Sequence, residues 1–169
     1  IRNLKKLKQT VLTNTVITKF NYQTLPQVAK LLIRLNVDQF QLAFVHALGN
    51  AEKNFDLIVP KKSQVIPYVK NALDRGMSAG MSVMTEAIPY CFLIGYEDCV
   101  GECRMPETKV FDFDCVYESF TKTRQKECKM KAPSCRKCRY FEECEGPWKE
   151  YPQHFGWNEF HPVISREFS

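Results

Sequence analysis

The chain has 169 residues, of which 44% are hydrophobic and 25% are charged, and its formal net charge is +5. This composition is typical of a soluble globular domain, alone or with a small appendage. No stretch approaches the roughly 18 consecutive apolar residues of a membrane-spanning helix, and there is no apolar signal segment. We therefore expect a cytoplasmic protein without a membrane partner.

The first elements expected along the chain are the end of a helix, a strand and a second helix. The chain begins at Ile1 within a helical pattern, which predicts that further residues precede it. Residues 11–18 are rich in β-branched side chains and indicate a buried parallel strand. Thr24 and Gln27 match a capping box, and the apolar spacing that follows predicts a helix over about 25–35.

Two further strands and another helix follow. Residues 38–46 alternate apolar and polar side chains, which predicts a second strand ending at His46. Ser63 is expected to cap a helix that Gly76 stops, and residues 79–86 indicate a third strand. Strands that alternate with helices in this way predict βαβ units, and hence an α/β fold with a parallel sheet.

The pattern changes near residue 88, where we place a boundary between segments 1–88 and 89–169. Basic residues concentrate in 122–139. We interpret them as cationic surroundings of an anionic thiolate–metal site, with a nucleic-acid surface as the alternative. An aromatic-rich tail begins at Trp148 and is expected to pack over a small metal domain.

The most informative motif is Cys135-x2-Cys138-x5-Cys144, three thiols in an otherwise basic and polar segment. Two cysteines spaced by two residues face one metal centre across a tight turn, and the third returns after a short loop. Zinc and iron–sulfur clusters both require such a geometry. The eight cysteines are even in number, but the intracellular character of the chain argues against disulfides. The chain offers five candidates for a fourth ligand: Cys91, Cys99, Cys103, Cys115 and Cys128.

These features together resemble a radical S-adenosylmethionine (SAM) enzyme. The strand at 11–18, the loop 49–51 after His46, and residues 86–91 are similar to the second half of its barrel. The three-cysteine motif with the following residues 145–148 resembles the SPASM or twitch type of auxiliary-cluster extension. The resemblance implies an α/β fold: the C-terminal half of a partial TIM barrel with parallel strands, followed by a small cysteine-rich metal-binding domain.

The chain departs from this family in two respects. The Cys-x3-Cys-x2-Cys motif that binds the SAM-cleaving cluster is absent from the 169 residues. The resemblance therefore places that motif before Ile1 and implies that these residues alone are inactive. A full SPASM pattern has a further cysteine where this chain has Trp148, which favours one auxiliary cluster instead of two.

The resemblance implies a set of metal ligands. Cys135, Cys138 and Cys144 are expected to bind an auxiliary 4Fe-4S cluster. The fourth ligand is expected to be Cys91, which follows the exit of the last strand, with Cys128 as the alternative.

The resemblance also implies residues that bind SAM. Barrel enzymes bind ligands at the carboxyl ends of their strands, and Asn14, His46 and Gly49 are implied there. Asn14 and His46 also have structural interpretations, as a partner of neighbouring strand backbone and as a hydrogen-bonded core histidine. We leave His154 and His161 out of the site because they have no metal-ligand spacing to one another.

The expected function is that of the C-terminal part of a radical SAM oxidoreductase whose auxiliary cluster assists substrate binding or electron transfer. The implied partners are SAM, a peptide or small-molecule substrate, and an electron donor such as ferredoxin or flavodoxin. The complete enzyme is expected to hold a second 4Fe-4S cluster. The alternative is a zinc-stabilised module whose basic surface around 122–139 contacts nucleic acid or protein.

Overall fold

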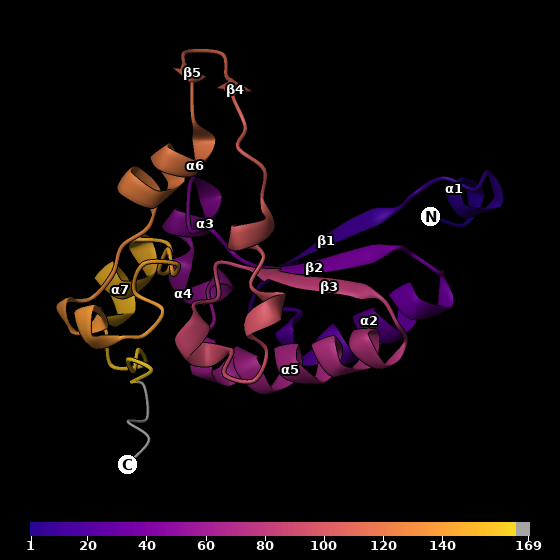
Figure 1. The fold of residues 1–169 in the computed structure, drawn as a ribbon, viewed down its shortest axis with the longest axis horizontal. Helices are drawn as coiled ribbons and strands as arrows, with labels where there is room; N and C mark the ends of the chain where they lie inside the picture. Colours follow the sequence, from indigo (N-terminus) through magenta and orange to yellow (C-terminus); the bar gives the residue numbers. More distant parts are fainter. Residues whose placement is uncertain (165–169) are drawn as a thin grey trace.

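A three-stranded parallel sheet with two long helices on one face forms the body of the molecule (Figure 1). The computed structural model describes residues 1–164. The strands are β1 (Leu12–Ile17), β2 (Gln39–Phe44) and β3 (Ser82–Glu86). They lie in the order β1-β2-β3, and both neighbouring pairs are parallel. The α/β fold with a parallel sheet expected from the sequence is confirmed.

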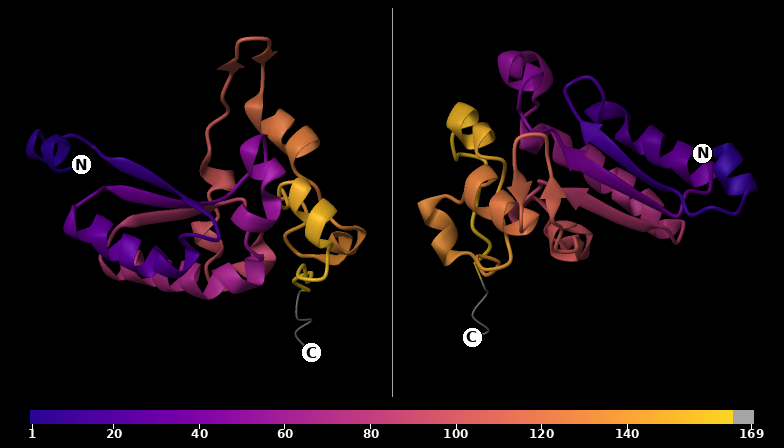
Figure 2. Two further views of the ribbon diagram at one scale, coloured as in Figure 1. Left: turned by 180° about the vertical axis from the view of Figure 1, so that it is seen from behind. Right: turned by 90° about the horizontal axis from the view of Figure 1, so that it is seen from above.

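The helices α2 (Leu25–Arg34) and α5 (Lys62–Ser78) pack side by side beneath this sheet (Figure 2). The expected helix over about 25–35 agrees with α2 to within one residue. Thr24 does precede α2, but its hydroxyl donates to the carbonyl of Asn21 and caps no helical N–H. The capping-box prediction is therefore wrong, because a short 3-10 turn precedes the helix and takes up the hydroxyl.

The role of Gly76 differs from the expected one. Helix α5 continues through Gly76 to Ser78, so Gly76 does not stop it. A Cβ atom at Gly76 would lie 2.4 Å from Cγ1 of Val83 and 2.7 Å from Cε1 of Phe40. The glycine is therefore explained by the close approach of α5 to the sheet. The helix begins at Lys62 and its N-cap is Lys61, so Ser63 is not its cap.

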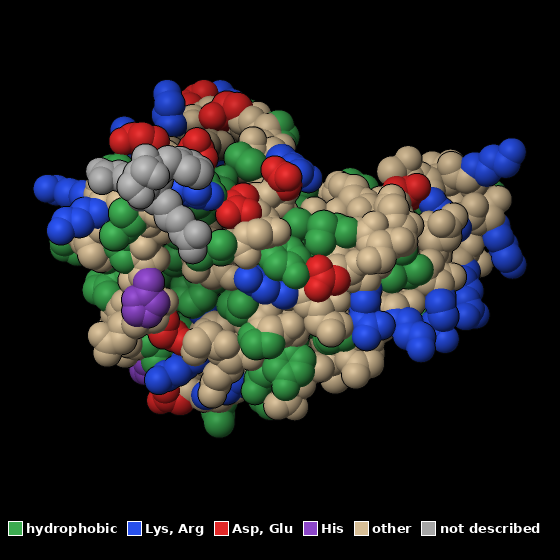
Figure 3. Space-filling model, turned by 60° about the horizontal axis from the view of Figure 1, so that its bottom comes forward, with side chains coloured by type: hydrophobic (Ala, Val, Ile, Leu, Met, Phe, Trp, Pro, Cys, Tyr) green, Lys and Arg blue, Asp and Glu red, His purple; other side chains and the backbone are tan. Residues whose placement is uncertain are grey.

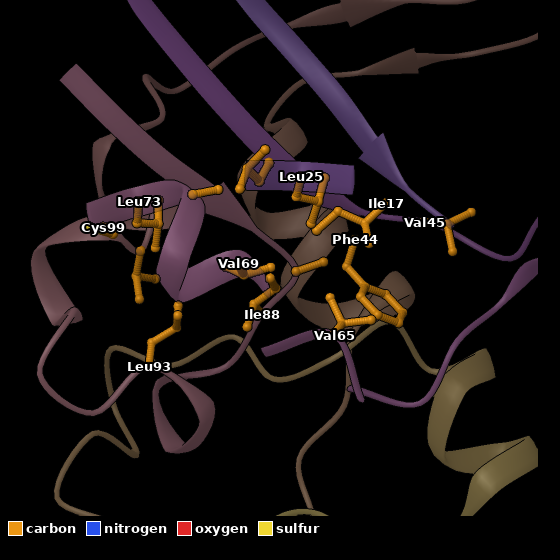
Figure 4. Packing of buried hydrophobic residues seen from close by; sticks show 14 of the residues in the cluster. Ile17, Leu25, Phe44, Val45, Val65, Val69, Leu73, Ile88, Leu93 and Cys99 are labelled. Carbon is orange, nitrogen blue, oxygen red and sulfur yellow. The ribbon is translucent and has the colours of Figure 1, made fainter. Parts of the chain in front are cut away.

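The two faces of the sheet have different surroundings. The apolar residues Phe40 and Phe44 of β2 are buried in the core. Figure 4 shows Phe44 close to Leu25 of α2 and Val65 of α5. On β1, however, the side chains of Leu12 and Val16 are 63% and 49% exposed. The prediction that residues 11–18 form a parallel strand is confirmed, but its expected burial is wrong for one face, because Leu12 and Val16 lie on the side of the edge strand away from α2 and α5.

The chain after β3 is built of short elements. In order, they are 3-10 turns at Tyr90–Phe92, Glu97–Cys99 and Glu102–Arg104, strands β4 (Val110–Phe111) and β5 (Val116–Tyr117), helix α6 (Phe120–Thr123), a π turn at Arg124–Cys128, a 3-10 turn at Pro133–Lys137 and helix α7 (Glu150–Phe155). The antiparallel hairpin β4–β5 projects from the side of the sheet opposite α5 (Figure 1). The remaining helices are α1 (Arg2–Lys6), α3 (Asn50–Lys53) and α4 (Phe55–Ile58). Among residues 1–164, none of the helices has the length and apolar character that crossing a membrane requires.

The aromatic tail packs against the carboxyl end of the sheet. Trp148 and Tyr151 are 7% and 2% exposed and belong to the same buried cluster as Phe44 and Ile88. The indole N–H of Trp148 donates to the carbonyl of Phe44 at 3.3 Å. These aromatic residues pack into the core, as expected, whereas their covering of a metal domain stays a prediction. Their packing places the cysteine-bearing segment beside the ends of β2 and β3 (Figure 2).

We predict that Gly76→Ala lowers the free energy of unfolding by about 1–3 kcal/mol, because the added methyl group overpacks the contact with the sheet. Alanine is the better helix former by about 1 kcal/mol, so propensity alone predicts the opposite sign. Ser78→Ala, at an exposed position of the same helix, is the control and should not destabilise the chain. Urea denaturation measures both variants, and a Gly76→Ala chain as stable as the wild type would contradict the close-approach explanation.

Candidate metal centre

Four of the eight cysteines line one cavity. Cys91, Cys135, Cys138 and Cys144 all lie in its wall, and the volume of the cavity is about 30 Å³. The accessible part of the wall is almost wholly apolar. Within residues 1–164, no group of three or more His, Cys, Asp or Glu side chains is arranged to hold a metal ion. The four sulfurs thus border a shared space without converging on a single point.

Local backbone structure explains how three of these thiols reach the cavity. The turn between Cys135 and Cys138 closes with a backbone hydrogen bond of 2.8 Å from the Cys138 N–H to the Cys135 carbonyl. A second turn brings back Cys144, whose N–H donates to the carbonyl of Tyr140 at 2.8 Å. Cys91 arrives separately, on the 3-10 turn that follows β3.

Gly146 closes one wall of the cavity. Its φ is +83°, and a Cβ atom there would lie 2.1 Å from the carbonyl oxygen of Met130. Pro147 follows in the same wall, and its carbonyl accepts the N–H of Met130 at 3.2 Å. Only glycine combines this backbone conformation with so close an approach, so the Gly-Pro pair after the cysteine motif shapes the cavity.

The thiols of the cavity influence one another. Burial raises the pKa of Cys91 to about 12, and the negative charges of Cys144, Cys135 and Cys138 add to the effect. Burial also raises the pKa of Cys144, although backbone hydrogen bonds from Gly146 and Tyr90 oppose the change. Thiolates this close repel one another, so a bound cation is needed to hold them deprotonated together.

The structure separates the two candidates for the fourth ligand. Cys91 lines the cavity with the other three cysteines, whereas Cys128 is not among its lining residues. The remaining cysteines are also elsewhere: Cys99 is buried in the core, and Cys103 and Cys115 are exposed.

His161 lies in the wall of the cysteine cavity. Its spacing to His154 does not match a metal-ligand motif, so the sequence did not predict it as part of the site. His154 is instead 2.9 Å from a carboxylate oxygen of Asp56 and stacks on Phe55. No local sequence pattern predicts His161 at this site, because its position in the cavity wall depends on how the chain after Phe160 folds back.

The three residues implied to bind SAM do not line the cysteine cavity. Asn14 is exposed on the uncovered face of β1. His46, just beyond β2, stacks on Trp148 with ring centres 3.9 Å apart, and its Nε2 lies 3.3 Å from a carboxylate oxygen of Glu150. Among residues 1–164, Nε2 has no partner with good hydrogen-bond geometry, so its contact with Glu150 is mainly electrostatic. Gly49 precedes α3 with a φ of +59°.

Two members of the basic segment 122–139 are buried in an ionic network. Arg124 donates two hydrogen bonds to Glu145, at 2.8 and 2.7 Å. The Nζ atom of Lys129 lies 2.5 Å from Glu102 and 3.1 Å from Glu145. Arg124 and Lys129 are thus paired with carboxylates and are not among the lining residues of the cysteine cavity. Lys131 of the same segment does line it and acts to lower the pKa of Cys144. The interpretation of the segment as thiolate surroundings stays a prediction.

The surface charge has its own distribution. In Figure 3, Lys and Arg side chains gather at the end of the molecule that carries α1. Exposed basic residues near the cysteine motif include Arg136 and Lys137, with the acidic Glu142 and Glu143 also exposed a few residues away. The segment around the motif therefore presents both signs of charge.

Comparisons of the chain with protein-family models, with curated proteins and with solved structures found no match. The function is therefore inferred from the residues and their arrangement.

We predict that acid destabilises the chain through Glu145. Burial acts to raise the pKa of Glu145, but Arg124 and Lys129 outweigh it and lower the pKa from 4.5 to about 2. The ionised carboxylate therefore stabilises the folded chain above pH 4.5, and this contribution is lost as the pH falls from 4.5 towards 2. Glu145→Gln should lower the free energy of unfolding at neutral pH by about 3–5 kcal/mol, because it leaves two buried cations undercompensated.

Denaturant unfolding of the wild type and of Glu145→Gln at several pH values between neutrality and pH 3 tests this prediction. The variant should lose less additional stability than the wild type below pH 4.5. Glu142→Gln, an exposed position of the same loop, is the control. Parallel pH profiles of the wild type and Glu145→Gln would contradict the assigned role.

Proposed function

We propose that the chain is the C-terminal part of a radical SAM iron–sulfur enzyme, in which Cys91, Cys135, Cys138 and Cys144 hold an auxiliary 4Fe-4S cluster. One observation carries the proposal: a cysteine from the turn after β3 and three cysteines from the later motif line the same cavity. More than 40 residues of chain separate Cys91 from Cys135, the first cysteine of the motif. Their proximity therefore depends on the fold as a whole.

The residues of the cavity fit a four-iron cluster. Such clusters are held by four cysteine thiolates, and their potentials depend on hydrogen bonds to sulfur and on solvent exposure. The N–H of Val163 donates to Sγ of Cys138 at 3.3 Å, and backbone N–H groups of Gly146 and Tyr90 act on Cys144. The apolar wall limits contact of the sulfurs with water. When bound, the cluster supplies one-electron transfer or an iron site that binds substrate.

The arrangement of the four sulfurs favours a cluster over a zinc ion. Zinc requires its four sulfur ligands at about 2.3 Å from one point, whereas the cysteines here border a shared cavity without converging on one point among residues 1–164. The zinc-stabilised binding module remains the competing assignment, and the metal content of the protein distinguishes the two.

The uncovered face of the sheet supports the barrel part of the proposal. In a TIM barrel, helices cover the outer face of the strands while the other face lines the interior. Here α2 and α5 lie on one face, and the second face presents polar side chains such as Asn14, Gln41 and Glu86. The amide of Gln41 donates to Glu86 at 2.6 Å. A half-buried polar pair on this uncovered face is consistent with a barrel interior that binds a polar ligand.

The proposed partners follow from this assignment. Asn14, His46 and Gly49 lie on or beyond the first two strands and are proposed to contact SAM. The substrate is proposed to be a peptide or small molecule, and the electron donor a ferredoxin or flavodoxin. The aromatic contacts of Trp148 hold the cysteine-bearing segment at the carboxyl end of the sheet, which supplies the fixed geometry that electron transfer and hydrogen abstraction require.

We predict that Cys91→Ala, Cys135→Ala, Cys138→Ala and Cys144→Ala each lower the bound iron and sulfide several-fold after anaerobic reconstitution, because a methyl group cannot replace a thiolate ligand. Cys128→Ala is the control for the fourth ligand and should retain the wild-type iron content. The wild-type protein should be brown. A colourless protein with stoichiometric zinc, or full iron content in Cys138→Ala, would contradict the cluster assignment.

We also predict that the reconstituted 169-residue chain does not cleave SAM, because the Cys-x3-Cys-x2-Cys ligands of a SAM-cleaving cluster are absent from it. The measurement is 5′-deoxyadenosine formed under reducing conditions, compared with free iron and sulfide as background. Formation above that background would show that the chain carries a SAM-cleaving centre of its own.

A further inference from the structure

Lys62 is a fully buried lysine at the first position of α5. Its exposure is 1%, and its Nζ donates to the carbonyl of Ala87 at 2.8 Å. The same Nζ lies 3.2 Å from the ring centre of Phe44 and 4.7 Å from that of Tyr151. Two aromatic faces and one carbonyl thus surround the ammonium group. Cation–π contacts of this kind stabilise a desolvated ammonium, but by less than its burial costs.

The ammonium group has no carboxylate partner. None of the ion pairs formed among residues 1–164 includes Lys62. Burial lowers its pKa well below the ordinary value, and Lys129 adds to this effect. Glu102, Glu159 and Cys91 act in the opposite direction from beyond ion-pair distance. A buried ion without a directly paired counter-ion is costly, so among residues 1–164 Lys62 lacks a carboxylate at ion-pair distance.

The cysteine cavity lies next to this position. The carbonyl that Lys62 binds belongs to Ala87, four residues before Cys91. The following residue, Ser63, lines a surface pocket together with Cys91. Helix α5 also directs its amino end, with its partial positive charge, towards this region. Among the anionic groups that act on Lys62, Cys91 belongs to the proposed centre.

We propose that Lys62 is the counter-charge of the metal centre and raises its reduction potential. This inference depends on the proposed function, because it requires a cluster on Cys91 and the three motif cysteines. A cluster bound by four thiolates carries net negative charge, and one-electron reduction makes it more negative. A nearby buried ammonium therefore favours the reduced state, since net charge and its surroundings set the potential of such clusters. Lys62 is not among the residues that line the cavity and acts on the centre through its charge.

The test compares midpoint potentials of reconstituted chains. Lys62→Met removes the charge while approximating the shape of the side chain, Lys62→Arg keeps the charge, and Lys61→Met alters an exposed neighbour. A redox titration followed by electron paramagnetic resonance should show a more negative midpoint for Lys62→Met. Lys62→Arg and Lys61→Met should stay close to the wild type. An unchanged midpoint in Lys62→Met would overturn the proposal.

Metal-free unfolding separates this electrostatic role from a merely structural one. Without metal, Lys62→Met should be as stable as the wild type or more stable, because an uncompensated buried charge has been removed. Lys62→Gln, which keeps a donor for the Ala87 carbonyl, should show the same shift in midpoint. Failure of both uncharged variants to fold without metal would assign Lys62 to structure and overturn the proposal. A wild-type chain that binds no cluster would contradict the proposed function itself, before any variant is compared.

Discussion

The position of the cysteine-bearing segment depends on Lys129, which is buried between two carboxylates. Its Nζ lies 2.5 Å from Glu102 and 3.1 Å from Glu145, and its side chain is 0% exposed. Glu102 also accepts the N–H of Ala87 at 2.7 Å, directly after β3. The network therefore joins the turn that leads to Cys91 with the wall that follows the cysteine motif. Removing any one member leaves a buried charge without its partner, which is far more costly than losing a surface ion pair.

Charge around the end of the sheet is compensated unevenly. Arg124 and Lys129 have carboxylate partners within hydrogen-bond distance, whereas Lys62 has only a carbonyl and two aromatic faces. The thiols of the cavity lack a positive partner for their ionised forms, because burial and mutual repulsion disfavour the thiolates. A metal cluster would relieve both, since its cations neutralise the thiolates and its remaining negative charge faces the lysine. The paired network holds the geometry, and the unpaired groups are where ligand chemistry is expected.

Much of the fold could be predicted from local patterns. The three strands, α2 and α5 were expected within a few residues of their observed bounds, because side-chain periodicity reports directly on helix and strand. The errors lie where a local pattern has two explanations. Gly76 is suited to a helix end and equally to a close helix–sheet contact, and only the positions of Phe40 and Val83 decide between them. The apolar strand at β1 suits a central position, but the sheet order places it at an edge.

The sequence by itself determined the order of elements and the three-cysteine motif, because both depend on spacing within a few turns of chain. It left the partner of that motif open between Cys91 and Cys128. Only the tertiary structure places Cys91 in the cavity wall with the motif and Cys128 outside it, and only the tertiary structure shows the burial of Lys62 and the place of His161 in that wall. Each of these depends on contacts between segments far apart in the chain. Such contacts are set by packing of the whole core, and no local spacing records them.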